Sequence, residues 1–514
     1  MLFRSINQNQ TNVTSVIGSA NYDIGHVFGT NSGGLAGLGV VCSSGQKASG
    51  VTGSGAPVGD AFDIDYVAHE MGHQFSGNHS FRGNTGSCSG NANGATAMEP
   101  GSGSSIMAYA GICSPQDVQP HSDDHFHGVN MNEMHLFMNG GGNTCAVSTP
   151  ITSQSAPTIT GTVGNVTIPI STPFALTATA TDPDGDVLTY CWEQMDNGQT
   201  GTATQPPVGT NTSGPNFRSR TPSASGTRYF PSIASLMAGG PFTWEVLPTV
   251  NRTMNFRCTV RDNEANGGCN DYADIVVTST ASAGPFIVNY PTASGITWPG
   301  NSTQTVTWSV ANTNVAPVAC ANVDVMISTD GGATFSVVAN NVPNDGSQVI
   351  TVPNTATTQA IVMVICENGT FFDVSNNFFT ITAATNDYTL NFQNATVSAC
   401  QGTDAVFTVV VGQIGSYSDP VTLSATGNPA GTTVSFTPNP ATPGTNATMT
   451  ITGTASATPG NYSVTVNGTS TSGAHFTNGT VLISTSGVVA STLTSPANAA
   501  TSVQIGRASC RERV

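Results

Sequence analysis

One eleven-residue segment limits what this chain can be more than any other feature. Beginning at His69, it reads His-Glu-Met-Gly-His-Gln-Phe-Ser-Gly-Asn-His. On a helix, His69 and His73 lie one turn apart on the same face, so both imidazoles can bind one metal ion beside Glu70. His79 lies beyond the helix and is expected to return through a turn at residues 76–78, because glycine tolerates a positive φ. The segment predicts a catalytic zinc site (Zn2+) with three histidine ligands and an open position for water.

A second element, Ser-Ile-Met-Ala-Tyr at residues 105–109, follows the histidines. With it, the sequence resembles the metzincin clan of zinc peptidases, whose long zinc motif is followed by a methionine-containing turn under the metal. Residues 6–146 are most similar to secreted bacterial reprolysin-like peptidases, chiefly between Asn21 and Phe81. Ser76 departs from the family pattern, which has glycine there. Either Ser76 takes a left-handed conformation, at a cost of about 1 kcal/mol, or the turn shifts by one residue.

The resemblance implies a role for each residue of the zinc motif. His69, His73 and His79 would bind zinc, and Glu70 would take a proton from water and pass it to the leaving amine.

The resemblance also assigns roles outside the motif. Met107 would form a floor beneath the ligands, and Tyr109 either stabilises the tetrahedral intermediate or simply packs. A glycine-rich segment forms either a flexible surface loop or the sheet edge along which a substrate peptide adds as a strand. The residues expected at that edge are Gly34, Leu35, Ala36 and Gly37.

Three helices are expected in this first domain: one that ends near residue 20, the active-site helix over 63–76 with Asp63 as its N-terminal cap, and a closing helix over 130–139. Asn130 and Glu133 resemble a capping box for the closing helix. Residues 121–127 contain three histidines and two aspartates, which indicate either a second metal site or a hydrogen-bonded loop.

The cysteines favour an oxidising compartment over a second zinc site, because none of the eleven shows Cys-x-x-Cys spacing. The first domain holds four cysteines, which allow three pairings. The resemblance favours two pairs among them: Cys42 with Cys145 and Cys88 with Cys113. Cys320 and Cys366 are expected to pair within one later module. The sequence leaves four others unassigned: Cys191, Cys258, Cys269 and Cys400.

After the first domain, helical periodicity disappears and short segments rich in Thr, Ser, Pro and Gly alternate apolar with polar residues. This pattern predicts β-sandwiches. We expect a cadherin-like or immunoglobulin-like sandwich over 150–282, immunoglobulin-like sandwiches over 285–384 and 386–485, and the start of a further β module over 486–504. The expected fold class is therefore multidomain, with an α+β metzincin-like catalytic domain followed by tandem all-β immunoglobulin-like sandwiches.

A loop in the first sandwich reads Asp-Pro-Asp-Gly-Asp and places carboxylates at Asp182, Asp184 and Asp186. Carboxylates at alternating positions around a glycine suit a hard cation, so the loop is a candidate calcium (Ca2+) site. The alternative is a plain Asp-Gly turn.

The two ends of the chain differ in composition from everything between them. Residues 1–5 and 505–514 resemble translated sequencing-adapter DNA and are set aside from the fold prediction. We therefore expect a fragment of a longer protein whose catalytic domain lacks its first strands. A sheet without those strands exposes edges and part of its core, so the fragment by itself is not guaranteed to fold or to be active.

Charge narrows the classes of partner. The chain carries 12 basic and 29 acidic residues, a formal net charge of −17, which disfavours nucleic acid and anionic membranes. No apolar run approaches the roughly 18 residues that span a membrane. The sequence indicates a secreted or cell-surface zinc endopeptidase that acts on proteins or peptides, with β modules that space the domain or bind a surface or matrix. The alternative is an adhesin or structural surface protein with a vestigial peptidase domain, which the presence of Glu70 among intact ligands argues against.

Overall fold

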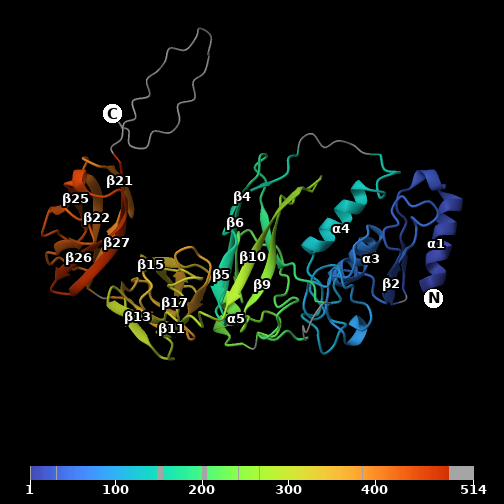
Figure 1. Ribbon diagram of the computed structural model, residues 1–514, viewed down its shortest axis with the longest axis horizontal. Coiled ribbons are helices and arrows are strands. Elements are labelled where there is room, and N and C mark those ends of the chain that lie inside the picture. The colour runs from blue at the N-terminus through green and yellow to red at the C-terminus, as the bar shows by residue number, and fades with distance from the viewer. Residues whose placement is uncertain are drawn as a thin grey trace, which may run out of the picture. The chain divides into compact units, whose positions relative to one another are not determined.

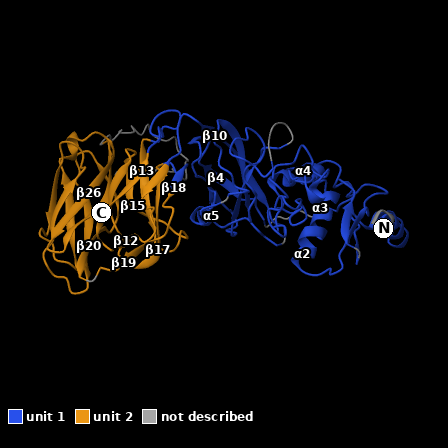
Figure 2. Ribbon diagram, turned by 90° about the horizontal axis from the view of Figure 1, so that it is seen from below, with its two compact units in different colours: residues 1–286, 310–320, 368–373 blue, residues 287–309, 321–367, 374–514 orange. Residues whose placement is uncertain are grey.

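The computed structural model describes residues 2–30, 32–147, 154–198, 205–240, 242–265, 267–384 and 386–485. The expected module start at 486–504 and the segment 505–514 lie outside these residues. The chain divides into two compact units (Figure 2). Unit 1 comprises Met1–Phe286, Val310–Cys320 and Asn368–Asp373, and unit 2 comprises Ile287–Ser309, Ala321–Glu367 and Val374–Val514.

Unit 1 begins with helices and a small sheet (Figure 1). The helical segments are α1 (Leu2–Val16), η1 (Ser19–Asn21), α2 (Asp60–Phe62), η2 (Asp63–Ala68), α3 (His69–Gln74), η3 (Gly86–Cys88) and α4 (Gly128–Asn139). The strands are β1 (Val27–Gly29), β2 (Gly33–Ala36) and β3 (Gly50–Gly53). They form a sheet in the order β1-β3-β2, with β1 parallel and β2 antiparallel to β3, so β2 is an edge strand.

The active-site helix begins earlier than expected. It starts at Asp60, after Gly59 in a positive-φ conformation, and continues through the π-helical segment η2 into α3. Asp63 therefore lies inside the helical segment, and its prediction as the N-terminal cap is wrong. The reason is that Asp60 supplies an acidic first turn before the apolar pattern begins, which periodicity alone does not reveal.

The closing helix α4 also begins earlier, at Gly128, and its cap is His127. Nδ1 of His127 accepts a hydrogen bond from the backbone N–H of Val129 at 3.2 Å. The predicted capping box is therefore wrong. The carboxylate of Glu133 is used for a tertiary contact instead, because it accepts hydrogen bonds from the backbone N–H (2.9 Å) and Nδ2 (2.6 Å) of Asn78.

The rest of unit 1 contains a β module with two sheets and one short helix, α5 (Ile233–Met237). A four-stranded sheet has the order β5 (Val166–Pro169), β10 (Asn270–Thr280), β9 (Arg252–Arg261) and β7 (Thr189–Gln194). A three-stranded sheet has the order β4 (Thr158–Thr162), β6 (Phe174–Thr181) and β8 (Thr227–Phe230). The aromatic rings of Phe174, Phe217, Phe230 and Phe256 are fully buried and contact one another.

Unit 2 contains the sheets of two further modules. The first has the sheet β11 (Ile287–Tyr290), β13 (Thr303–Ser309) and β16 (Ser347–Thr351). Its larger sheet contains β12 (Thr297–Pro299), β19 (Phe379–Thr382), β17 (Thr357–Cys366), β14 (Asn322–Ser328) and β15 (Ser336–Pro343). The short strand β18 (Phe372–Val374) spans the boundary of the two units along the chain.

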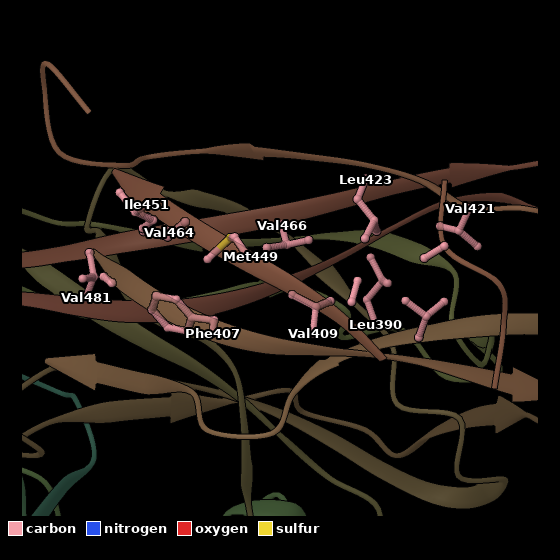
Figure 3. Packing of buried hydrophobic residues seen from close by; sticks show 14 of the residues in the cluster. Leu390, Phe407, Val409, Val421, Leu423, Met449, Ile451, Val464, Val466 and Val481 are labelled. Carbon is pink, nitrogen blue, oxygen red and sulfur yellow. The ribbon is translucent and has the colours of Figure 1, made fainter. Parts of the chain in front are cut away.

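The second module of unit 2 is a pair of four-stranded sheets. One has the order β20 (Asp387–Phe392), β22 (Ala405–Ile414), β25 (Thr445–Thr452) and β24 (Thr433–Thr437). The other has the order β21 (Thr396–Cys400), β27 (Gly473–Ser484), β26 (Gly460–Ser470) and β23 (Thr422–Thr426), and η4 (Thr454–Ser456) lies between β25 and β26 in the chain. Inward-facing residues of both sheets, such as Phe407, Met449 and Val464, form one buried core (Figure 3).

The three β modules share one arrangement of strands. In each, the first two strands join different sheets, and the second strand pairs in parallel with the last one. These parallel pairs are β5 with β10, β12 with β19 and β21 with β27. The modules thus repeat an architecture, and the fold is mostly β, as the alternating sequence pattern predicts. Within the described residues, no helix combines the length and apolar character needed to cross a bilayer.

Candidate metal centre

Three imidazoles converge in unit 1. His69 and His73 lie one turn apart on α3, and His79 comes from the loop that follows. One ring nitrogen from each lies within 4.8 Å of the others, and the Nε2 atoms of His73 and His79 are 3.1 Å apart. Nε2 of His69 is buried and has no hydrogen-bond partner. A buried nitrogen without a hydrogen-bond partner lowers the stability of the fold unless a ligand or a metal ion binds it.

Each of these rings is oriented through its other nitrogen. The Nδ1 atoms of His69, His73 and His79 lie at hydrogen-bond distance from three backbone carbonyl oxygens: those of Ile106 (2.8 Å), Gly77 (2.7 Å) and Asn91 (2.6 Å), respectively. A carbonyl only accepts, so each Nδ1 donates and each Nε2 carries a free lone pair. Outer hydrogen bonds of this kind fix metal-binding histidines in their tautomer and orientation, so the three residues fit a zinc ion.

The electrostatics of the cluster keep the rings neutral. Burial and the neighbouring imidazole of His73 lower the pKa of His79 to about 4. Burial, together with the other two rings, lowers the pKa of His69 well below its ordinary value. Neutral imidazoles are the form that binds metal, so the set is ready to bind at neutral pH.

The turn between His73 and His79 follows the first of the two alternatives open at the sequence level. Ser76 has a φ of +76°, in the left-handed region. The backbone N–H of Ser76 donates to the carbonyl of His73, and that of Gly77 donates to the carbonyl of Gly72, both at 2.8 Å. These bonds close the helix end and turn the chain back towards the other ligands.

Met107 lies under α3 and is fully buried. Gly72, which stands between the first two histidines, makes room for it, since a β-carbon built at Gly72 would lie 2.4 Å from Sδ of Met107. The carbonyl of Ile106, the residue before Met107, accepts from His69. The turn at residues 105–109 therefore supports both the helix and one ligand.

Glu70 and Tyr109 face a cleft of about 800 Å3 that also contains His69, Gly34 and Ile112 in its walls. Oε2 of Glu70 is buried without a hydrogen-bond partner, and burial raises the pKa of this carboxyl to about 8. The ring of Tyr109 lies with its centroid 4.6 Å from that of His79, and burial together with Glu70 raises its pKa to about 12. The cleft thus brings an unpartnered carboxyl and a phenol together beside the imidazoles.

Of the four residues predicted for the substrate edge, Gly34 lines this cleft. Gly34, Leu35 and Ala36 belong to the edge strand β2, and Gly37 follows it, donating from its N–H to the carbonyl of Ser49 at 2.8 Å.

Residues 4–135 match the model described as metallo-peptidase family M12B, reprolysin-like. The match supports a metallopeptidase domain in this segment, which contains all three histidines and Glu70. No curated protein gives a significant match to the chain.

Solved structures resemble the chain only loosely. Domains 4 and 5 of the S-layer protein SbsC share 16% identity at a TM-score of 0.16, covering 35% of this chain and 82% of that one. The EC1-4 region of Drosophila N-cadherin shares 13% sequence identity at a TM-score of 0.17, and the match covers 65% of this chain and 76% of that one. Fibronectin(III)-like modules of CbhA from Clostridium thermocellum share 10% sequence identity at a TM-score of 0.15, and the match covers 39% of this chain and 95% of that one. At such scores, the description of the β modules rests on their own strand pairing.

Two disulfides connect residues in the first part of unit 1. Cys42 is bonded to Cys145, and Cys88 to Cys113, which are the pairs that the family resemblance implies. Further along the chain, three cysteines are also disulfide-bonded: Cys320, Cys366 and Cys400. Three are free thiols: Cys191, Cys258 and Cys269.

The candidate calcium loop brings its carboxylates together. Ligand oxygens of Asp182, Asp184 and Asp186 lie within 4.8 Å of one another. Oδ1 of Asp182 also accepts hydrogen bonds from three backbone N–H groups of the loop, at 2.8 to 3.2 Å, which is the geometry of a tight aspartate turn. Calcium binding here stays a prediction.

Several residues support the centre through contacts that the sequence does not reveal. Gly34 and Gly72 act by having no side chain, and Asn91 and Ile106 act through their backbones. Glu99 is a further one, because its buried carboxylate accepts hydrogen bonds from the hydroxyls of the serines beside His79 and before Ile106. Only the glycine within the zinc motif could have been singled out beforehand, from its place between two ligands.

Proposed function

We propose that the reprolysin-like segment is the catalytic domain of a zinc-dependent endopeptidase. One observation carries this proposal: three Nε2 lone pairs converge, each ring being fixed through Nδ1, beside the unpartnered carboxyl of Glu70. When bound there, zinc supplies Lewis acidity, which lowers the pKa of water and polarises a substrate carbonyl.

The residues of the chain have separate tasks in this reaction. Glu70 takes the proton of the attacking water and later donates it to the leaving amine, because its carboxyl faces the cleft and its Oε2 has no other hydrogen-bond partner. Tyr109 donates its phenol proton in a hydrogen bond to the oxygen that gains charge at the scissile carbonyl. Met107 and Gly72 hold the two helical ligands from below.

Substrates in this proposal are extended protein or peptide segments. The edge of β2 beside Glu70 offers backbone groups for strand addition at Gly34, Leu35 and Ala36. We also propose that the protein acts outside the cytoplasm, since its disulfides need an oxidising compartment.

Glu70→Gln in the full chain tests the mechanism. Glutamine keeps the shape of the side chain but cannot carry a proton between water and amine. We expect the variant to keep the wild-type zinc affinity and to lose peptide cleavage by a factor of roughly a hundred to ten thousand. Asp60→Asn, which removes an exposed carboxylate from the first turn of the same helical segment, is the matched control and should cleave normally. Cleavage that survives in Glu70→Gln contradicts the mechanism.

A second candidate is a surface adhesin or structural protein whose peptidase domain no longer acts. The three β modules, which make up most of the described chain, favour it. In that case the wild-type chain would bind zinc without cleaving any of a panel of unfolded proteins, and Glu70→Gln would change nothing. We favour the peptidase because Glu70 has no structural partner for its Oε2 and would be free to change in a domain that had lost catalysis.

A further inference from the structure

A buried carboxylate from the β module of unit 1 reaches into the reprolysin-like segment. Glu193, on β7, has no exposed surface. Its Oε2 accepts a hydrogen bond from the backbone N–H of Gly128 (2.8 Å), and its Oε1 accepts one from the hydroxyl of Ser219 (2.5 Å). Nε2 of His125 lies 3.5 Å from the same Oε1, and Nε2 of His127 lies 3.8 Å from it. The carboxylate of Glu193 thus lies close to four groups, three of them from residues 125–128.

The surroundings keep this carboxylate ionised. Burial alone would raise the pKa of Glu193, but the neighbouring side chains of His127, His125 and Arg261 outweigh burial and hold this pKa well below its ordinary range. Gly128 is also the first residue of α4, where helix dipoles favour a negative charge. A buried ion satisfied in this way is costly to disturb, because removing it leaves its partners without compensation.

One route leads from Glu193 to His69. Nε2 of His125 lies 2.9 Å from the hydroxyl of Ser219, which donates to Glu193. The backbone carbonyl of His125 accepts a hydrogen bond from the N–H of Ile106 at 3.0 Å. The carbonyl of Ile106 in turn accepts from Nδ1 of His69 at 2.8 Å. The orientation of this imidazole therefore depends on where the carboxylate holds residue 125.

A second route leads to His79 through α4. Glu193 fixes the first N–H of that helix, at Gly128. Two and five residues further on, two side chains of the helix bind Asn78: Nδ2 of Asn130 donates to its carbonyl (2.7 Å), and Glu133 accepts from its N–H (2.9 Å). Asn78 directly precedes His79, so a shift of α4 moves the third imidazole.

We propose that Glu193 is a positioning residue for the metal centre, and that the β module which carries it is part of the support of His69 and His79. This inference rests on the proposed function, since it assigns Glu193 to the same zinc site. It explains why residues 121–127, read from the sequence as either a metal site or a hydrogen-bonded loop, include two fully packed histidines.

A second metal site at His125, Cys191 and Glu193 is the competing interpretation, because their ligand atoms lie within 4.8 Å of one another. The hydrogen bonds favour the positioning role. Both oxygens of Glu193 already accept good hydrogen bonds, from Gly128 and Ser219, so a metal would have to displace them. The thiol of Cys191 likewise lies 3.3 Å from a backbone carbonyl, that of Arg220.

Glu193→Gln in the full chain, with zinc affinity measured by competition against a chromophoric chelator, tests the proposal. The amide keeps the shape but cannot accept at both ends and carries no charge. We expect roughly a tenfold loss of zinc affinity, the lower end of the effect of residues that orient metal ligands. Glu245→Gln is the matched control, because Glu245 is a buried carboxylate of the same module that pairs with Arg220 and Arg228. It should lower the melting temperature while leaving zinc affinity within twofold of wild type.

Ser219→Ala is a milder variant in case Glu193→Gln does not fold. It removes only the bridging hydroxyl and should weaken zinc binding in the same direction by a smaller factor. Wild-type affinity in both variants overturns the proposal, and so does an equal loss in the Glu245→Gln control. A wild-type chain with two zinc ions, one of which is lost in Glu193→Gln, overturns it in favour of the second metal site. A wild-type chain that binds no zinc contradicts the proposed function itself.

Discussion

Gly34 and Glu70 are packed so closely that no side chain fits between them: a β-carbon built at Gly34 would lie 2.0 Å from Oε1 of Glu70. Gly34 lies on the edge strand β2, and Glu70 lies on α3. The contact joins the strand that lines the cleft to the carboxyl that we assign as the general base. Space, not backbone conformation, requires glycine here, because Gly34 is not among the residues with positive φ.

Gly34→Ala should therefore displace the carboxyl of Glu70 without touching the imidazoles. We expect kcat/KM for a peptide substrate to fall at least tenfold, which corresponds to about 1.4 kcal/mol, while the bound zinc per chain stays unchanged. Gly29→Ala, in strand β1 of the same sheet, is the control, since a β-carbon built at Gly29 meets nothing within 4 Å. Equal activity in both variants would show that the carboxyl of Glu70 can move away from residue 34 without a loss of kcat/KM.

Tyr109→Phe separates the two roles that the sequence leaves open for this residue. Phenylalanine keeps the ring contacts with His79 and Phe81, whose centroids lie 4.6 and 4.7 Å away. If the hydroxyl stabilises charge in the reaction, kcat falls about a hundredfold with little change in KM. Tyr66→Phe, in the same cleft, is the control and should leave kcat within twofold. An unchanged kcat in Tyr109→Phe would assign the ring to packing alone.

The stability of the zinc-free protein should depend on pH through Glu70. Its folded-state pKa is about 8, against an ordinary 4.5, so the folded chain keeps a proton that the unfolded chain releases. The stabilisation is complete below pH 4.5 and is lost as the pH rises through 8. The imidazoles act in the opposite sense: burial lowers the pKa of His79 to about 4 and also lowers the pKa values of His69 and His73, so together they outweigh Glu70 and stability falls as the pH drops below 6.5. Stability should therefore be greatest near pH 6.5.

Glu70→Gln tests whether the carboxyl of Glu70 causes the loss of stability as the pH rises towards 8. Glutamine does not ionise, so the variant should gain on the wild type progressively between pH 4.5 and 8, by a total on the order of a few kcal/mol, and the two profiles should be parallel below pH 4.5. Urea unfolding of the zinc-free proteins at pH 4.5 and 8.5 measures the difference. Parallel profiles for the two chains would mean that the carboxyl of Glu70 is already ionised when folded.

The donors of the candidate metal centre could be predicted from the sequence because they lie within one helical turn and the loop after it. Their supports could not. Glu193 reaches the histidines only through tertiary contacts, and no local pattern marks it. Gly34 lies in a glycine-rich segment expected at the substrate edge, but its close contact with Glu70 is also tertiary. The closing helix shows the same limit: Glu133 has the spacing of a capping residue, yet Asn78 takes both of its oxygens. The β modules were predictable for the opposite reason, since alternation along a strand, as at Met254 and Phe256, is itself local.

Ser76→Gly should stabilise the turn that carries the third histidine. Ser76 has a φ of +76°, a conformation that costs an L-residue about 1 kcal/mol and costs glycine almost nothing. Glycine also gains freedom in the unfolded chain, so the net increase in the free energy of unfolding should be at most about 1 kcal/mol. Ser89→Gly is the control, because Ser89 has a φ of −62° and should lose stability on the same change. Urea denaturation of the zinc-loaded proteins compares them, and a destabilised Ser76→Gly would mean that contacts of the serine side chain outweigh its backbone strain.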